Sequence, residues 1–201
     1  MAAMPKAGLT YSPKIPAPDY TKIKNIATDT VKRELGVVVR PDVLIVKAAE
    51  IVRQADAEIA LHADERNAAV ASLWFYDQVL SLDQTIGVAR NAYREILSKA
   101  LYGDAKKPVP ALDDSEELQA LAKHHGVPRI PDAASNVVEL ARIVASARAR
   151  RAAALFFMQE AALVLCEAPY EWTPDKIAEH ADITRRLVYN LRDAAAKRRD
   201  K

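Results

Sequence analysis

Apolar residues recur at helical spacing along nearly the whole chain, and this pattern is the strongest limit on how it can fold. Between residues 41 and 62 they recur every three or four positions, twice as adjacent pairs, at Val43, Leu44, Ala48, Ile51, Val52, Ala55 and Ile59. Such spacing places them on one face of a helix. Strand-type alternation is rare, and only five residues of 201 are glycine. The sequence therefore predicts an all-α, multi-helix protein.

Capping residues and breakers divide this pattern into predicted helices. Pro41 at a first helical turn and Gly36 after a last one are typical of helix ends. The predicted helices cover residues 20–35, 41–62, 64–80, 89–101, 115–125, 131–166 with a break near Ser146, 174–181 and 184–198. The aromatic run at 74–76 is expected to fill the core.

Proline content suggests how the helices are grouped. Residues 1–20 hold four prolines and few large apolar side chains, which predicts a flexible arm. Residues 104–114 combine prolines with charged residues and are the best candidate linker. We therefore expect one helical domain at 21–103 and a second at 115–201.

Composition excludes several classes of protein. Half of the residues are apolar and 28% are charged, which argues against a disordered chain. A single cysteine, Cys166, rules out a disulfide framework and any paired-cysteine metal site. No apolar stretch approaches 18 residues, and residues 1–20 lack the apolar core of a signal peptide. The expected location is therefore the cytoplasm.

Positive charge is concentrated near the C-terminus. The whole chain has a net charge of only +2, whereas residues 183–201 hold seven Lys and Arg against two Asp and Glu. This is the electrostatic footprint that an anionic partner would need. A solvated basic helix end would look the same, because Lys and Arg favour the helix dipole there.

The segment 173–191 carries the most specific pattern. Ala178 is small where two helices would cross closely, Asp182 stands at a tight turn, and Thr184 can cap a following helix. Six positions that would face inward are all apolar: Ile177, Ala178, Ala181, Ile183, Val188 and Leu191. The segment resembles the helix-turn-helix of bacterial and phage DNA-binding regulators. Glycine is usual at the position of Asp182, and Asp tolerates the left-handed backbone better than most residues.

The resemblance implies a C-terminal three-helix module over about residues 150–198, with its helix-turn-helix at 173–198 and no β wing. The second helix of the pair would enter the major groove of double-stranded DNA. The implied DNA-binding residues are Thr173, Lys176, Thr184, Arg185, Arg186, Tyr189, Asn190, Arg192, Lys197 and Arg198. Among them, Lys176, Arg192, Lys197 and Arg198 would hold phosphates.

A second segment, 87–97, also looks like the turn and second helix of such a motif. Gly87 would form the turn, and Arg90, Asn91 and Arg94 would face outward as a second DNA-binding element. The degenerate motif would span 66–101, with Asp83 where a small residue is expected. The alternative is an amphipathic core helix. A third fragment, 118–127, is interpreted as a capped helix end.

Several kinds of chemistry lack a sequence signature. The four histidines have no metal-ligand spacing, and no glycine-rich phosphate loop or nucleophile elbow is present. Cys166 lies on an apolar helical face and is expected in the core. We therefore expect no enzyme activity, no metal and no cofactor.

The sequence thus predicts a sequence-specific DNA-binding protein associated with the nucleoid, and the leading hypothesis is a transcriptional regulator. A homodimer would read a palindromic site, whereas a monomer would suffice if the second motif binds DNA. A partition, replication or nucleoid protein, or a sigma-like factor, would use the same motif. A helical protein-interaction adaptor that never touches DNA is the alternative from another class.

Overall fold

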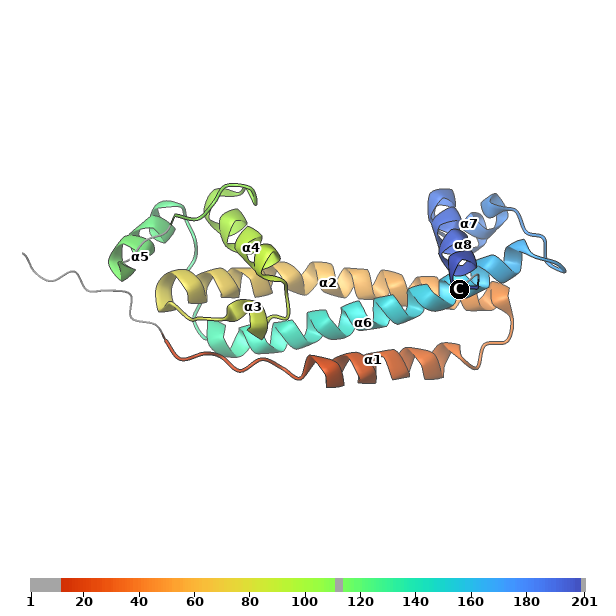
Figure 1. The fold of residues 1–201 in the computed structure, drawn as a ribbon, viewed down its shortest axis with the longest axis horizontal. Coiled ribbons are helices and arrows are strands. Elements are labelled where there is room, and N and C mark those ends of the chain that lie inside the picture. Colours follow the sequence, from red (N-terminus) through yellow and green to blue (C-terminus); the bar gives the residue numbers. More distant parts are fainter. Residues whose placement is uncertain (1–11, 111–113, 200–201) are drawn as a thin grey trace, which may run out of the picture. The chain divides into compact units, whose positions relative to one another are not determined.

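The structure of the protein is a computed structural model that describes residues 12–110 and 114–199. These residues form helices and no strand, apart from an isolated bridge between Ser12 and Val79. The described helices are α1 (Tyr20–Leu35), α2 (Pro41–Asp77), α3 (Leu82–Thr85), α4 (Arg90–Tyr102), α5 (Ser115–His124), α6 (Ala133–Cys166), α7 (Pro174–Ala181) and α8 (Arg185–Arg199) (Figure 1). The all-α prediction is confirmed. No described helix is long and apolar enough to cross a membrane.

Two of the helices are longer than predicted. α2 is one helix of 37 residues, where a break near residues 62–64 was expected. No glycine or proline stands there, so nothing interrupts the backbone hydrogen bonds. α6 likewise runs unbroken through Ser146 and is 34 residues long. A serine inside a helix costs at most about 0.7 kcal/mol relative to alanine, and neighbouring turns outweigh that.

The described residues divide into two compact units, and neither is continuous in sequence. The first contains residues 12–20, 60–110 and 114–144, and the second contains residues 21–59 and 145–199. Both long helices contribute to both units. This differs from the predicted division at 104–114, because residues on either side of that segment share one core. Of the predicted linker and arm, residues 111–113 and 1–11 lie outside the described part of the chain.

The core of the first unit joins α2, α3, α4, α5 and α6. Phe75 and Leu82 are fully buried, and Leu97, Leu118 and Val137 pack in the same cluster. Burying each such side chain contributes about 1.5–3 kcal/mol relative to leaving it in water. Because Leu97 precedes residues 104–114 and Leu118 follows them, this burial holds the predicted linker inside a single unit.

The aromatic run at 74–76 behaves as predicted. Phe75 is fully buried, and Tyr76 is buried with its hydroxyl donating to the Val127 carbonyl oxygen at 2.6 Å. Trp74 is partly buried and meets Tyr93 edge to face, with ring centroids 6.5 Å apart. These three side chains fill the core of the first unit.

Residues 12–20 are attached to the first unit, which differs from the flexible arm predicted there. The Thr85 hydroxyl of α3 donates to the Ile15 carbonyl oxygen at 2.8 Å. The Tyr20 hydroxyl donates to the Thr85 carbonyl oxygen at 2.5 Å. Proline content signals the extended backbone of this segment, but it cannot reveal hydrogen bonds to a distant helix.

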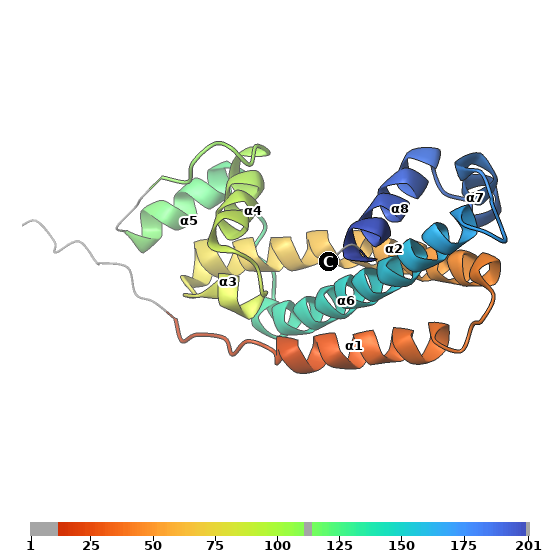
Figure 2. The same ribbon diagram turned by 45° about the vertical axis from the view of Figure 1, so that its right-hand side comes forward.

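The core of the second unit brings together α1, α2, α6, α7 and α8. Leu35 of α1, Ile45 of α2 and Leu165 of α6 are buried in one cluster with Ile177 and Val188 of the last two helices. This cluster holds α7 and α8 against the longer helices of the unit. Figures 1 and 2 show α7 and α8 beside the C-terminal part of α6. Cys166 is partly buried against the same cluster, and burial raises the pKa of its thiol.

Candidate nucleic-acid interface

α7 begins where the sequence predicts, because residues 173 and 174 favour a helix start. The Thr173 hydroxyl oxygen accepts from the Lys176 N–H at 3.3 Å, which satisfies one donor of the first turn. Pro174 follows at the start of the helix, where its missing N–H has no cost. Thr173 therefore caps the helix, because its side chain accepts a hydrogen bond from the backbone of the first turn.

The turn between α7 and α8 has the left-handed backbone predicted at Asp182, with φ 52° and ψ 55°. The Asp182 N–H lies 3.4 Å from the Glu179 carbonyl oxygen. The Ile183 N–H donates to the Ala178 carbonyl oxygen at 3.0 Å. These bonds close the C-terminal end of α7 and turn the chain directly into the next helix.

α8 starts at Arg185, one residue after the cap. The Thr184 hydroxyl oxygen accepts from the Leu187 N–H, and the Thr184 carbonyl oxygen accepts from the Val188 N–H, both at 3.2 Å. Only three residues therefore separate α7 from α8 (Figure 2). Such a short connection restricts the angle between the two helices.

The inner face of the helix pair is apolar, as predicted. Four of the six expected positions are buried, namely Ile177, Ala181, Val188 and Leu191. The other two, Ala178 and Ile183, are partly buried and pack against the same cluster. Because these side chains turn inward, the polar side chains of α8 are held on its outer face.

Arg185, Arg186 and Asn190 are exposed on that outer face. Arg185 lies 3.3 Å from the Asp175 carboxylate, and its guanidinium donates to the Tyr189 hydroxyl at 3.1 Å. The hydrogen bond to Tyr189 and the charge of Asp175 raise the pKa of Arg185. Within the described part of the chain, Arg186 has no ion-pair partner.

The residues expected to hold phosphates differ from one another in their surroundings. Lys176 lies over the Trp172 ring, 4.1 Å from its centroid. Arg192 lies 2.9 Å from the Asp193 carboxylate and also faces the Tyr189 ring. Lys197 is exposed and, among the described residues, has no ion pair.

Arg198 is directed toward α6. It lies 2.7 Å from the Glu160 carboxylate, contacts Gln159 and covers the Phe156 ring. Arg199, beside it, lies 2.9 Å from the Glu167 carboxylate. The basic end of α8 is therefore partly neutralised by acidic residues of the preceding long helix, which a count of charges along the sequence does not show.

Sequence reasoning missed Arg53 of α2, which contacts the turn. Its guanidinium donates to the carbonyl oxygens of Ala181 and Asp182, both at 3.4 Å, and lies 3.8 Å from the Asp182 carboxylate. These donors stabilise the carbonyls at the end of α7, which have no partner inside the helix. Arg53 lies 128 positions before Ala181, so no local spacing could have identified it.

α3 and α4 of the first unit are joined by a turn with the same hydrogen bonds. Gly87 is left-handed, with φ 63°, and its N–H donates to the Gln84 carbonyl oxygen at 3.2 Å. The Val88 N–H donates to the Asp83 carbonyl oxygen at 3.0 Å, as Ile183 does to Ala178. Leu82 and Ile86 are buried where Ile177 and Ala181 are buried in the other pair. The side chain of Asp83 does not obstruct the turn, because the turn uses its carbonyl oxygen.

The end of α5 shows which part of this geometry is general. The Val127 N–H donates to the Ala122 carbonyl oxygen at 2.9 Å beside a left-handed Gly126, with φ 73°. No helix follows until Ala133. Residues 118–127 are thus the capped helix end that the sequence predicts. The turn alone is a common helix ending, and the immediate start of a second helix distinguishes the α3–α4 and α7–α8 pairs.

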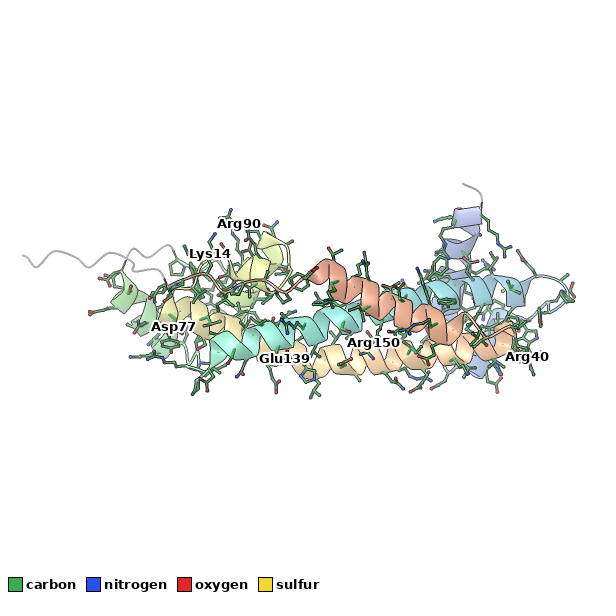
Figure 3. The ribbon with its side chains drawn as sticks, turned by 90° about the horizontal axis from the view of Figure 1, so that it is seen from below. Lys14, Arg40, Asp77, Arg90, Glu139 and Arg150 are labelled. Carbon is green, nitrogen blue, oxygen red and sulfur yellow. The ribbon has the colours of Figure 1, made fainter. Side chains whose placement is uncertain are left out.

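The outward residues of α4 are Arg90, Asn91 and Arg94, and all three are exposed. Figure 3 labels Arg90 at the start of this helix. None of the three has an ion pair or side-chain hydrogen bond within the described ranges.

No group of three or more His, Cys, Asp and Glu among the described residues is placed to hold a metal ion.

Comparison with known proteins adds no relative, since no family model, curated protein or solved structure matches the chain.

Proposed function

We propose that this chain binds double-stranded DNA through α7 and α8, with α8 in the major groove, and that it regulates transcription. The observation that carries the proposal is the outer face of α8. It presents Arg185, Arg186 and Asn190 next to a tight left-handed turn, while the opposite face is buried. Arginine and asparagine are the side chains that most often form paired hydrogen bonds with guanine and adenine edges.

The packing of the helix pair supports this proposal. Ile177 and Val188 are fully buried between the helices and the core of their unit. The Thr184 cap and the Arg53 contacts further restrict the start of α8. A reading helix must hold its side chains at a fixed distance from the base edges, and rigid support from the core supplies this.

The ion pairs of the outer face are compatible with DNA binding. Arg185 and Asp175 are both exposed, and pairs of this kind are weak in water. A phosphate offers the guanidinium a stronger, two-point partner than one carboxylate oxygen. Residues 173–199 hold seven Lys and Arg against four Asp and Glu, so the segment attracts an anionic partner.

One helix pair supplies few contacts, and specific sites usually need two reading elements. A homodimer would place two copies of α8 on a palindromic site. A chain with a second reading element would bind an asymmetric site as a monomer. The measured stoichiometry on a selected DNA site distinguishes these arrangements.

The test compares fluorescence anisotropy of the wild type with a variant carrying Arg185→Ala and Arg186→Ala. Both are titrated with labelled random duplex from about 50 to 300 mM salt, the range in which phosphate contacts show. A matched control carries Lys24→Ala and Lys47→Ala, which removes the same charge from exposed positions of the same unit. Circular dichroism must first show equal helicity.

We expect the logarithm of the wild-type affinity to fall linearly with the logarithm of salt concentration, and the double variant to lose most of that affinity. The control should stay within about twofold, since neither lysine lies on α7 or α8 and exposed charges are screened by salt. Absence of wild-type binding at the lowest salt would overturn the proposal and favour a protein-interaction adaptor. If DNA is bound, selected sites in promoters support regulation, whereas clustered repeats support partition, replication or nucleoid organisation instead.

A further inference from the structure

The first unit presents a second basic surface that the α7–α8 proposal does not use. Its members are Lys14 of the N-terminal segment with Arg90, Asn91 and Arg94 of α4, and this set is called the α4 surface below. All four side chains are exposed. Figure 3 labels Lys14 and Arg90 on the side of the molecule that it shows.

Two separate segments form this surface, and named contacts hold them together. The Thr85 hydroxyl bonds to the Ile15 carbonyl oxygen, so Lys14 is fixed next to α3. The Tyr20 ring packs under the turn, because a Cβ added at Gly87 would lie 2.7 Å from its Cζ. Lys14 therefore belongs to an extended segment that is attached beside the α3–α4 turn.

The charges of the α4 surface are not neutralised. Neither Lys14, Arg90 nor Arg94 forms an ion pair in the described part of the chain. The acidic residues nearest in sequence are Asp19 for Lys14, and Asp83 on α3 and Glu95 on α4 for the two arginines. The Asp83 carboxylate acts on Tyr93, whose pKa is raised first by burial and then by that charge. Three unpaired cations thus face solvent here, whereas most of the arginines of α8 are paired.

Most of the exposed side chains of α4 lie in its first two turns, whereas its later turns are largely buried apart from Lys99. Leu97, Ser98 and Leu101 are buried, and residues 90, 91, 94 and 95 are exposed. Helix-turn-helix proteins contact DNA mainly through the N-terminal residues of the second helix. The accessible part of α4 is the part that such contact needs.

We infer that the α4 surface is a second DNA-contacting element, which binds duplex phosphates through Lys14, Arg90 and Arg94 and places Asn91 toward the base edges. The inference rests on the proposed function, because it assigns another contact with the same partner. The extended segment adds a cation from outside the helix pair, so the α4 surface does not depend on one helix alone. DNA phosphates are a partner that fits three solvated cations, none of which forms an ion pair with a carboxylate in the described ranges.

The test uses the full chain with Arg90→Ala and Arg94→Ala in the salt titration described above. The matched control carries Lys99→Ala and Lys123→Ala, two exposed lysines of the same unit. Lys99 lies about half a turn round α4 from Arg90, since successive residues rotate by about 100°. A third variant, Lys14→Ala, changes a residue outside every helix, so its effect cannot come from a disrupted helix.

We expect the arginine variant to weaken binding about tenfold or more at about 100 mM salt, and to reduce the salt slope by about 0.9 for each phosphate that it no longer neutralises. Lys14→Ala should reduce the slope by about half as much, and the lysine control should match the wild type. If the arginine variant equals its control while Arg185→Ala with Arg186→Ala loses binding, this inference is overturned and the proposed function stands. If the wild type does not bind DNA at all, both are overturned.

Discussion

The α3–α4 and α7–α8 pairs have the same turn but differ in what surrounds it. Both turns use one left-handed residue and a backbone bond to the carbonyl oxygen five residues earlier. At α7–α8 the left-handed residue is Asp182, which is supported by Arg53, and the arginines Arg185 and Arg192 have acidic partners. At α3–α4 it is Gly87, packed on Tyr20, and the arginines have no such partner among the described residues. The backbone geometry of the turn and the charge of the surface around it are therefore set by different residues.

The largest loss of stability should come from truncating the fully buried side chain of α3 or of α7. Ile177→Ala and Leu82→Ala should each lower the free energy of unfolding by about 2–5 kcal/mol, because both side chains are fully buried and leave a cavity. Urea unfolding followed by circular dichroism measures this loss. Ile26→Ala, at a position 57% exposed, is the control and should change stability by less than about 0.5 kcal/mol. Equal losses for all three variants would contradict the assigned cores.

The next largest loss of stability should come from a substitution in the turn between α3 and α4. Gly87→Ala combines a left-handed backbone, which costs about 1–2 kcal/mol, with a Cβ placed 2.7 Å from the Tyr20 ring. Gly103→Ala has the same backbone penalty, at φ 69°, but no atom within 4 Å of the added Cβ. Thermal and urea unfolding should therefore show Gly87→Ala as the more destabilised of the two. Identical losses would mean that the Tyr20 ring does not restrict the turn.

A smaller loss of stability should follow when the extended segment 12–19 is detached from α3. The α7–α8 pair has no such segment among the described residues. Thr85→Val removes the hydroxyl that donates to Ile15 and should cost about 0.5–1.5 kcal/mol. Hydrogen exchange should then become faster in residues 12–19 and stay unchanged in α8. Unchanged exchange in residues 12–19 would show that this hydrogen bond does not hold the segment in place.

The smallest change in stability should be an increase, from a substitution at the turn between α7 and α8. Asp182→Gly replaces a residue that is strained at φ 52° with one that adopts this backbone freely. It also removes an exposed ion pair with Arg53, which contributes little. The expected result is a rise of about 0.5–1 kcal/mol in the free energy of unfolding, measured by urea unfolding, whereas a decrease would show that the Asp182 side chain supports the turn.

The sequence predicts the local features of both pairs well, because caps, turns and helical spacing are local. The bounds of α7, the left-handed Asp182 and the buried Ile177 all follow from neighbouring residues. α3 was not predicted, since a four-residue helix has too few turns to show a period. The unbroken α2 was missed because polar residues near 62–64 resemble a helix end.

Contacts between distant residues could not be predicted from spacing. Arg53 at the turn, Arg198 on Glu160 and Ile15 on Thr85 each join positions far apart in sequence. These contacts depend on how the long helices pack within each unit, which a single sequence does not encode in any short pattern. They also change the candidate site most, since they decide which cations are paired.

DNA cross-linking from the outer face of α8 tests directly whether this helix contacts DNA. A photoactivatable group is attached to Asn190→Cys in a Cys166→Ala background, and the control carries the group at Lys47→Cys, an exposed position of α2 in the same unit. If α8 contacts DNA, position 190 should cross-link strongly to duplex DNA, position 47 should cross-link little, and the cross-linking from position 190 should disappear at high salt. Equal cross-linking from both positions, or none from position 190 while DNA is bound, would contradict it.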